Sequence, residues 1–488
     1  MILDFAIPAN ARPRDCDLLI LGAGPAGITL ALELARARPD LHIILAEAGG
    51  LEPSTGEERD LYQGESLGTA NYPLDTSRLR YFGGTSGHWG GWVRPMDSVD
   101  FKPRPQAGVP GWPIDYDSMQ PHYQAAHRWL EVPSADYQAE NLSPELRGRL
   151  LDFSASDLFR NRLFRFSPPT RFGTRYRQDI EAATNIECLL NAAAVDYRFQ
   201  GGRLAQVTLS GLHGQRATVE AAQVVVAMGG IESARHLLMM RALETTAEGL
   251  QSATLGRGFA DHTGLRPGVI LLPEDRVYQR VRDGEAGVMP VICPTPQALA
   301  EQGWNNSCMM LDVMPNHPSL PTGYMTQIAL GLSDHAYWPY RITMILEPRP
   351  NDNSRIELST ERDALGLPRP QLYWELMDSD YQSAHDTFKT FGREMARLGL
   401  GRAQIAPLDT ELRRRSANPV YHHMGTARMA ADASHGVVDP QLKVFGAQNL
   451  HVLSSAVFPS YGFSNPTMTI VALAHRLAGH LANAVLAA

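Results

Sequence analysis

Residues 17–27 read Asp17-Leu18-Leu19-Ile20-Leu21-Gly22-Ala23-Gly24-Pro25-Ala26-Gly27, an apolar run that leads into three glycines spaced G-x-G-x-x-G. The residues that follow, 28–37, are apolar at helical spacing and rich in Ala and Leu. Strand, tight turn and helix in this order are typical of a dinucleotide-binding βαβ unit. Gly22 allows the turn, Gly24 lets a pyrophosphate approach the backbone, and Gly27 lets the helix pack on the strand.

A second apolar run, 41–46, strengthens this interpretation because it ends at Glu47, twenty residues after Gly27. An acidic side chain at this place can accept hydrogen bonds from the ribose hydroxyls of adenosine. The helix N-terminus near Ala26 offers free N–H groups and the positive end of the helix dipole to the phosphates. We therefore predict a dinucleotide site; the alternative is a glycine-rich turn without a ligand.

The size and composition of the chain fit a globular protein of about two domains, since it has 488 residues. Its net charge is −8 and Lys and Arg are scattered, so no nucleic-acid partner is expected. It has no apolar run of about 18 residues and no N-terminal signal pattern, so we expect a cytoplasmic protein without a membrane span. The four cysteines lack metal-ligand spacing and are expected to be reduced, although Cys293 and Cys308 could pair in an exported protein.

A second glycine-rich stretch, Arg80-Tyr81-Phe82-Gly83-Gly84-Thr85-Ser86-Gly87-His88-Trp89-Gly90-Gly91-Trp92, follows the βαβ unit. Five glycines in thirteen residues exclude a regular helix or a central strand. A surface loop is the simple interpretation, but two tryptophans and a histidine in it favour a loop that covers a flat ligand.

The rest of the chain predicts an α/β fold, with a Rossmann-like dinucleotide-binding domain and a second, mostly antiparallel α+β substrate domain. The apolar run 223–228 enters a glycine pair and a helix, so the first domain resumes there. Strand-like runs at 266–272, 341–347, 355–358 and 371–376 suggest the antiparallel sheet. We expect the first domain to comprise 1–100, 180–260 and 416–488, and the substrate-binding domain to comprise 101–179 and 261–415.

Two polar segments near the C-terminus are the candidates for catalysis. One is Tyr421-His422-His423-Met424-Gly425-Thr426, and the other is Asn465-Pro466-Thr467 at the start of a final helix. The chain has neither a G-x-S-x-G elbow nor an H-E-x-x-H motif, and no metal site is expected.

Taken in order over nearly the whole length, these segments resemble the glucose–methanol–choline (GMC) family of flavin oxidoreductases. The pair His88-Trp89 is similar to the branch of pyranose oxidase, glucoside 3-dehydrogenase and gluconate/fructose dehydrogenase. Ser454 departs from the family pattern, because an acid often stands there near the flavin phosphates. The motifs that carry the resemblance are the first glycine turn with Glu47, Gly83 to Ser86, Val224 to Arg235, Gly256-Arg257 with Asp261-His262, His422 to Met429 and Asn465 to Thr469.

The resemblance implies that FAD is bound in an extended form along the first domain. It places the phosphates at the first glycine turn, the adenosine end at Glu47, and the flavin ring beneath the loop 83–91. The N-terminus of the final helix would stabilise negative charge on the reduced ring. The implied cofactor contacts are Gly22, Gly24, Ala26, Gly27, Glu47, Gly83, Gly84, Thr85, Ser86, His88, Trp89, Gly90, Ala194, Ala227, Gly229, Ser455, Asn465, Pro466 and Thr467.

The implied reaction is oxidation of a CH–OH group by hydride transfer to flavin N5. A neutral histidine can take the hydroxyl proton near pH 7, and a second polar group can hold the developing alkoxide. The family motif assigns these roles to His422 and Asn465, with His423 as the nearest rival. His262 is expected to be structural.

The substrate is expected to be a sugar, a glycoside or a polyol, and the electron acceptor oxygen or another molecule. The alternatives are an aromatic or other alcohol as substrate, and a flavoprotein subunit that passes electrons to a partner heme or membrane subunit. A nicotinamide-dependent enzyme is disfavoured because there is no second glycine fingerprint. In this branch the histidine before the tryptophan can be joined to the flavin 8α-methyl carbon, so His88 either carries a covalent flavin or packs beside it.

Overall fold

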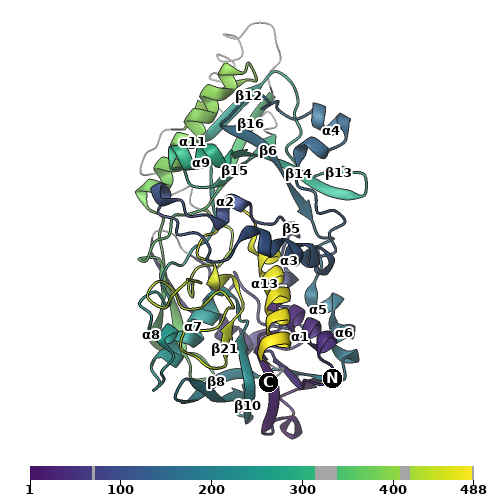
Figure 1. The fold of residues 1–488 in the computed structure, drawn as a ribbon, viewed down its shortest axis with the longest axis vertical. Coiled ribbons are helices and arrows are strands. Elements are labelled where there is room, and N and C mark those ends of the chain that lie inside the picture. Colours follow the sequence, from purple (N-terminus) through teal and green to yellow (C-terminus); the bar gives the residue numbers. More distant parts are fainter. Residues whose placement is uncertain (69–71, 314–337, 407–417, 486–488) are drawn as a thin grey trace.

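The computed structural model describes residues 1–68, 72–313, 338–406 and 418–485, and two large sheets organise it (Figure 1). The first sheet has the order β1-β7-β3-β2-β10-β9-β8, with β21 also paired to β10. Strands β7, β3, β2, β10 and β21 are parallel, whereas β9 and β8 extend the sheet in antiparallel pairs. The bounds are β1 Ile2–Asp4, β2 Arg14–Leu21, β3 Ile43–Ala46, β7 Ile186–Leu190, β8 Ala193–Gln200, β9 Arg203–Ser210, β10 Arg216–Val226 and β21 Leu450–Val452.

The glycine turn connects β2 to α1 (Pro25–Ala37) as the sequence predicts. Gly22 has a φ of +109°, and a Cβ there would lie 2.6 Å from the Ala227 carbonyl oxygen at the end of β10. Helix α7 (Gly229–Arg241) follows β10 in the same way. The carboxyl ends of three parallel strands therefore meet at one edge, the place where open α/β sheets bind ligands.

The second sheet is antiparallel and lies in the upper half of Figure 1, with α11 (Asp378–Arg397) across one face. Its side chains alternate: Met309 and Ile342 pack with Phe388 of α11, while Phe164 and Cys308 belong to a cluster on the opposite face. Its order is β19-β12-β16-β15-β14-β6-β5, with β11, β13 and β20 at its margins. The bounds are β5 Trp92–Val93, β6 Phe159–Phe166, β11 Thr263–Leu265, β12 Gly268–Leu272, β13 Val281–Asp283, β14 Ala286–Pro294, β15 Ser307–Val313, β16 Trp338–Leu346, β19 Arg402–Ile405 and β20 Asn418–Pro419.

Two predicted strands lie elsewhere than expected. The runs 355–358 and 371–376 form β17 (Arg355–Arg362) and β18 (Pro368–Trp374), which pair with each other and with β4 (Glu65–Gly68) in a separate three-stranded sheet. Leu372 and Trp374 pack against Ile231 of α7. Their apolar face therefore covers a helix of the first domain, and the expectation that they join the large antiparallel sheet is wrong.

Helix α3 (Tyr116–Trp129) also packs with the first sheet, although we expected its residues in the substrate-binding domain. Met119 and Tyr123 belong to the same core as Leu473 of α13 (Pro466–His480). The Tyr123 and Thr469 hydroxyl oxygens are 3.0 Å apart across this contact. The remaining helices are α2 Ser98–Phe101, α4 Pro144–Gly148, α5 Phe172–Arg175, α6 Arg177–Ala182, α8 Glu248–Gln251 and α9 Pro296–Gln302.

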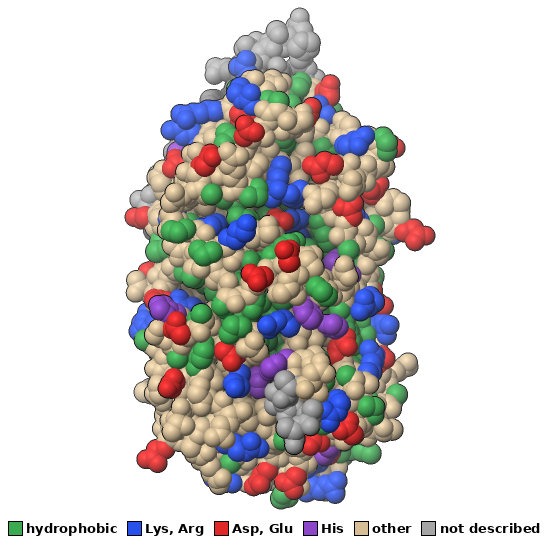
Figure 2. All heavy atoms as spheres, viewed as in Figure 1, with side chains coloured by type: hydrophobic (Ala, Val, Ile, Leu, Met, Phe, Trp, Pro, Cys, Tyr) green, Lys and Arg blue, Asp and Glu red, His purple; other side chains and the backbone are tan. Residues whose placement is uncertain are grey.

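The surface in Figure 2 shows Lys and Arg side chains interspersed with Asp and Glu. All four cysteines, Cys16, Cys188, Cys293 and Cys308, are free. In the part of the chain that the structure describes, no helix combines the length and the apolar character needed to cross a membrane.

Candidate active site

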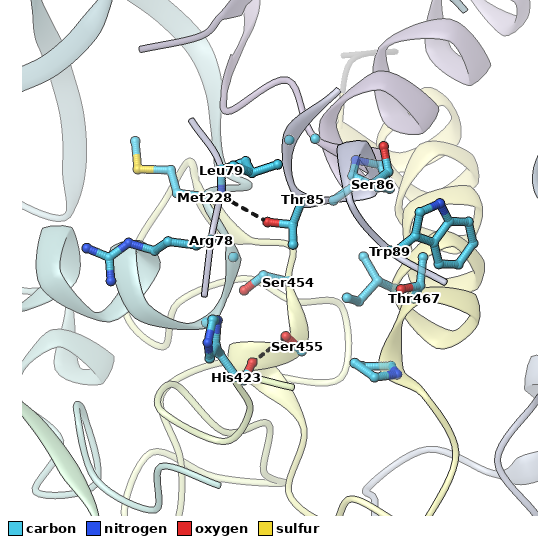
Figure 3. Close-up of a pocket in the computed structure, with 18 of the residues that line it drawn as sticks. Arg78, Leu79, Thr85, Ser86, Trp89, Met228, His423, Ser454, Ser455 and Thr467 are labelled. Atoms are coloured by element: carbon cyan, nitrogen blue, oxygen red, sulfur yellow. Dashed lines mark hydrogen bonds between the residues drawn. The ribbon is translucent and has the colours of Figure 1, made fainter. Parts of the chain in front are cut away.

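A cavity of about 610 Å³ lies at the carboxyl ends of β2, β3 and β10 and extends to the second sheet. Figure 3 shows part of its wall, where the loop 83–91 faces the segment that carries His423 and Ser455. Among the residues predicted from the sequence, those that line it are Gly22, Gly24, Ala26, Glu47, Gly84, Thr85, Ser86, His88, Trp89, Gly90, Ala194, Ala227, Gly229, His422, His423, Ser455, Asn465, Pro466 and Thr467.

Gly27 and Gly83 were predicted as cofactor contacts, but they shape the backbone behind the cavity wall. A Cβ on Gly27 would lie 1.9 Å from the Gly22 carbonyl oxygen. Gly83 has a φ of +101°, its N–H donates to the Ala23 carbonyl at 2.8 Å, and a Cβ would lie 2.4 Å from the Gly173 nitrogen. Only glycine permits these two close approaches. The hydrogen bond from Gly83 to Ala23 joins the loop 83–91 to the first glycine turn.

The N-terminus of α1 opens into the cavity. Its N-cap residue Gly24 makes no side-chain capping bond, and no heavy atom lies within 4 Å of an ideal Cβ built on Gly24. Pro25 occupies the first turn, where its missing N–H costs nothing. Unpaired N–H groups at a helix N-terminus beside open space suit a diphosphate.

Glu47 ties the end of β3 to the glycine turn. Its carboxylate accepts a hydrogen bond from the Ala23 N–H at 2.8 Å and another from the Gly49 N–H at 3.1 Å. Burial raises the pKa of Glu47, and these two donors oppose the shift. A carboxylate has about four acceptor positions, so Glu47 can still receive a ligand hydroxyl.

The loop 83–91 is fixed from behind by Arg171, a residue whose role the sequence did not reveal. The Arg171 guanidinium donates to the Ser86 carbonyl at 2.7 Å and to the Trp89 carbonyl at 2.8 Å. The Thr85 hydroxyl accepts from the Leu79 N–H at 3.4 Å, as drawn in Figure 3. His88, which these bonds flank, is exposed at the cavity, and partial desolvation together with Arg171 lowers its pKa.

Asp261 holds the backbone that presents His422. Tyr421 has a φ of +66°, a left-handed conformation that is uncommon for a residue with a Cβ. The Asp261 carboxylate accepts from the N–H groups of Tyr421 at 2.9 Å and of His422 at 2.8 Å. The Tyr72 hydroxyl donates to it at 2.7 Å. These bonds stabilise the turn at Tyr421 and His422. From the sequence, Asp261 was noted only as part of the pair Asp261-His262.

A chain of hydrogen bonds fixes the tautomer of His422. His262 Nε2 lies 2.8 Å from the Gly462 carbonyl oxygen, which can only accept, so Nε2 carries the proton of the neutral ring. His262 Nδ1 then accepts from His422 Nδ1, 2.9 Å away. His422 Nε2 is therefore unprotonated, and it lies 3.1 Å from the Nδ2 of Asn465. His262, expected to be structural, positions the candidate base.

The environment keeps His422 neutral. Burial lowers its pKa well below the usual value of 6.5, and His262 and His423 add to this shift. Asn465 is the N-cap of α13, yet its side chain makes no capping bond and contacts His422 instead. A bare imidazole nitrogen and an amide donor thus meet at the cavity, as abstraction of a hydroxyl proton requires.

His423 points to different neighbours. Its ring packs near Tyr72 and Phe259, with centroids 5.7 and 6.1 Å apart, and its carbonyl accepts from the Ser455 hydroxyl at 2.5 Å (Figure 3). Its Nε2 has no hydrogen-bond partner among the described atoms. Burial, followed by Arg78 and His88, lowers its pKa to about 3. His423 therefore lies at the cavity without the amide partner that His422 has.

Several cavity residues were missed in the sequence. Buried Arg78 lies 3.0 Å from Glu232 of α7, an ion pair that bridges two segments 154 positions apart. In the sequence, an arginine shortly before the glycine-rich loop indicates such an ion pair only weakly. Further missed residues are apolar and come mostly from the second sheet, among them Phe164, Met310, Ile345 and Phe463. In the described part of the chain, no cluster of three or more His, Cys, Asp or Glu could hold a metal ion.

Comparisons with known proteins place parts of the chain in two family models and give several relatives. A family model described as GMC oxidoreductase matches residues 350–474, and one described as lycopene cyclase protein matches 17–76. The 6'''-hydroxyparomomycin C oxidase of Streptomyces lividus is 24% identical over 96% of this chain and 92% of its own length. The C-glycoside 3-oxidase of Microbacterium trichothecenolyticum is 37% identical over 126 residues, which span 26% of this chain and 23% of that relative.

The fold is shared with solved structures. Pyridoxine 4-oxidase from Mesorbium loti superimposes with a TM-score of 0.59 and 17% identity over 95% of this chain and 99% of its own. The first family model covers the segment that carries His422 and Asn465, and the S. lividus relative aligns over nearly the whole length. Residues 350–474 thus carry the GMC oxidoreductase family pattern, and the chain as a whole is similar in sequence to an oxidase and in fold to pyridoxine 4-oxidase.

Proposed function

We propose that this protein uses FAD to oxidise a CH–OH group, with His422 as the base and Asn465 as the donor to the substrate oxygen. The observation that carries the proposal is the unprotonated Nε2 of His422 beside the Asn465 amide at the cavity wall. FAD supplies the acceptor for the substrate hydride. The N-terminus of α1 and Glu47 would hold its diphosphate and adenosine, and the loop 83–91 with the N-terminus of α13 would hold its ring.

The residues of this chain divide the work on the substrate. His422 Nε2 takes the hydroxyl proton, because the Nδ1 proton of the ring is committed to His262 and the residue lines the cavity. Asn465 Nδ2 donates to the oxygen as negative charge develops there. Asp261 keeps the His422 backbone in place through the transfer.

We propose a sugar, a glycoside or a polyol as the substrate and oxygen as the acceptor. Support comes from two relatives whose names describe a C-glycoside 3-oxidase and a hydroxyparomomycin oxidase.

The test is anaerobic mixing of purified holoprotein with a panel of sugars, glycosides and alcohols. Loss of the oxidised flavin absorbance, followed by its return when air is admitted, is the expected result. A flavin that no alcohol reduces would contradict the proposed reaction. A flavin that is reduced but returns only with an artificial dye would contradict oxygen as the acceptor.

A further inference from the structure

A short segment before α13, residues 461–465, contacts both sides of the His422 hydrogen-bond chain. The Gly462 carbonyl oxygen in it lies 2.8 Å from His262 Nε2, and His262 in turn contacts His422 Nδ1. At the end of the segment, Asn465 Nδ2 lies 3.1 Å from His422 Nε2. The conformation of this segment therefore controls the partners of both ring nitrogens of the candidate base.

The backbone of this segment is held by Glu347, a buried residue directly after β16. Its Oε1 accepts a hydrogen bond from the Tyr461 N–H at 2.9 Å and another from the Gly462 N–H at 2.8 Å. The Gly462 N–H and the Tyr461 carbonyl belong to one peptide group, and that carbonyl oxygen lies 3.3 Å from His262 Nε2. Glu347 therefore fixes a peptide group whose oxygen points at His262.

Arg104 holds the other oxygen of the Glu347 carboxylate. Its Nη2 donates to Oε2 at 2.5 Å, and both side chains are buried. A buried carboxylate is stable only when it is paired and hydrogen-bonded, and here three donors surround it. An amide in its place would turn an NH₂ group either toward Arg104 or toward the two backbone N–H groups. The site therefore requires a carboxylate.

We propose that Glu347 is a positioning residue for the reaction, because it fixes the 461–462 peptide and so keeps the proton of His262 on Nε2. The inference rests on the proposed function and adds to it a residue outside the cavity lining. If the peptide turned, His262 would carry its proton on Nδ1 and donate it to His422 Nδ1. His422 would then be protonated on Nε2, where it has no lone pair left to accept a hydroxyl proton.

The chain offers a matched control in Asp363, a buried residue directly after β17. Its Oδ1 accepts from the N–H groups of Leu365 at 2.9 Å and of Leu367 at 3.0 Å, and its Oδ2 accepts from Arg235 at 2.6 Å. Asp363 thus has the same kinds of partners as Glu347, but it holds the connection between β17 and β18. Loss of either carboxylate should lower stability, whereas only loss of Glu347 should reach His262.

The test measures the limiting rate of flavin reduction in the holoenzyme by anaerobic stopped-flow spectroscopy, with the fastest-reacting alcohol of the panel above. We expect Glu347→Gln to lower this rate by about tenfold and Asp363→Asn to keep it within about twofold, although both lower the Tm. In the background of His262→Leu, Glu347→Gln should cause no further loss, because both changes act on the same hydrogen-bond chain.

A purely structural role of Glu347 predicts other results. Equal rate losses in Glu347→Gln and Asp363→Asn, or a loss that persists in the His262→Leu background, would overturn the inference and leave the proposed function standing. If Glu347→Gln does not fold, Arg104→Lys takes its place in the same comparison, since it keeps a cation near Glu347 but loosens the contact. An unchanged rate in Arg104→Lys would also overturn the inference. A wild-type flavin that no alcohol reduces would overturn both the inference and the proposed function.

Discussion

At the scale of single residues, the protonation of His422 depends on three neighbours. The Gly462 carbonyl orients His262, His262 orients His422, and the free Nε2 of His422 faces Asn465. A ring nitrogen acts as a base only in the correct tautomer, so the proposed reaction would depend on residues remote from the substrate.

Replacing the two proposed catalytic residues should slow flavin reduction by different factors. We expect His422→Ala to lower the rate of flavin reduction by about 10²–10⁴, which is the usual contribution of a positioned base to a reaction rate. Asn465→Ala should lower it by about 10²–10³, the worth of one oxyanion donor. The measurement is anaerobic stopped-flow spectroscopy, with His423→Ala as the matched control. A larger loss in His423→Ala than in His422→Ala would contradict the assignment.

His262 should act through the tautomer of His422. His262→Leu removes the acceptor for the His422 Nδ1 proton and should lower the rate of flavin reduction by about tenfold while flavin stays bound. His262→Gln offers an amide oxygen to the same proton and should restore part of the rate. Equal rates in the two variants would show that only the volume of His262 matters.

The enzyme should keep its kcat/KM to a lower pH than it would with a base whose histidine pKa is unperturbed. The base works when neutral, and burial lowers the pKa of His422 well below 6.5. We therefore expect kcat/KM to stay constant as the pH falls through 6.5, and to decline only at lower pH as His422 takes up a proton. A midpoint at or above 6.5 in initial-rate measurements would contradict it.

At the scale of elements, some glycines of the strand–turn–helix unit serve folding and another serves ligand binding. Gly22 and Gly27 allow backbone to approach backbone, whereas Gly24 leaves space that only a ligand can fill. The loop 83–91 rests on this turn through the bond from Gly83 to Ala23. The two glycine-rich segments therefore form one cradle.

Two alanine substitutions in the first turn should have opposite effects. Gly24 has an ordinary φ of −80°, and its Cβ position is open, so Gly24→Ala should leave the Tm of the cofactor-free protein unchanged. It should weaken FAD binding by about tenfold or more, because the methyl group occupies the diphosphate space. Gly27→Ala should instead lower the Tm, since its Cβ would overlap the Gly22 carbonyl. Thermal unfolding and flavin titration would measure both; a fall in Tm for Gly24→Ala would contradict this division.

The loop 83–91 also positions His88, whose covalent bond to flavin stays a prediction of the family resemblance. The side chain lines the cavity, and its lowered pKa leaves the imidazole neutral and nucleophilic at pH 7. If the bond forms, acid precipitation of the holoprotein should give a yellow pellet, and His88→Ala should give a white pellet with a yellow supernatant. A white pellet from the wild type would mean that His88 packs beside the ring without a bond.

At the scale of the whole molecule, the candidate active site lies between two sheets. The first sheet supplies the glycine turn and Glu47, and the second supplies apolar side chains of the cavity lining such as Phe164 and Ile345. His262 lies directly before β11 of the second sheet, and Asn465 directly before α13 on the first domain. Catalysis therefore depends on how the two parts are joined, in which α3, β17 and β18 take part by packing on elements of the first domain.

The sequence by itself determined the parts whose demands are local. The G-x-G-x-x-G spacing fixed the turn between β2 and α1, because only glycine tolerates the contacts at Gly22 and Gly27. The family pattern singled out His422 and Asn465, 43 positions apart, and the structure brings them to 3.1 Å.

Only the tertiary structure decided the rest. The bond from His422 to His262 joins residues 160 positions apart, and Arg171 reaches the loop 83–91 from more than 80 positions away. The tautomer of His422 and the sheet to which β17 and β18 belong both result from such distant contacts. No local pattern encodes them, because hydrophobic burial and hydrogen bonding across the core choose the partners once the chain has folded.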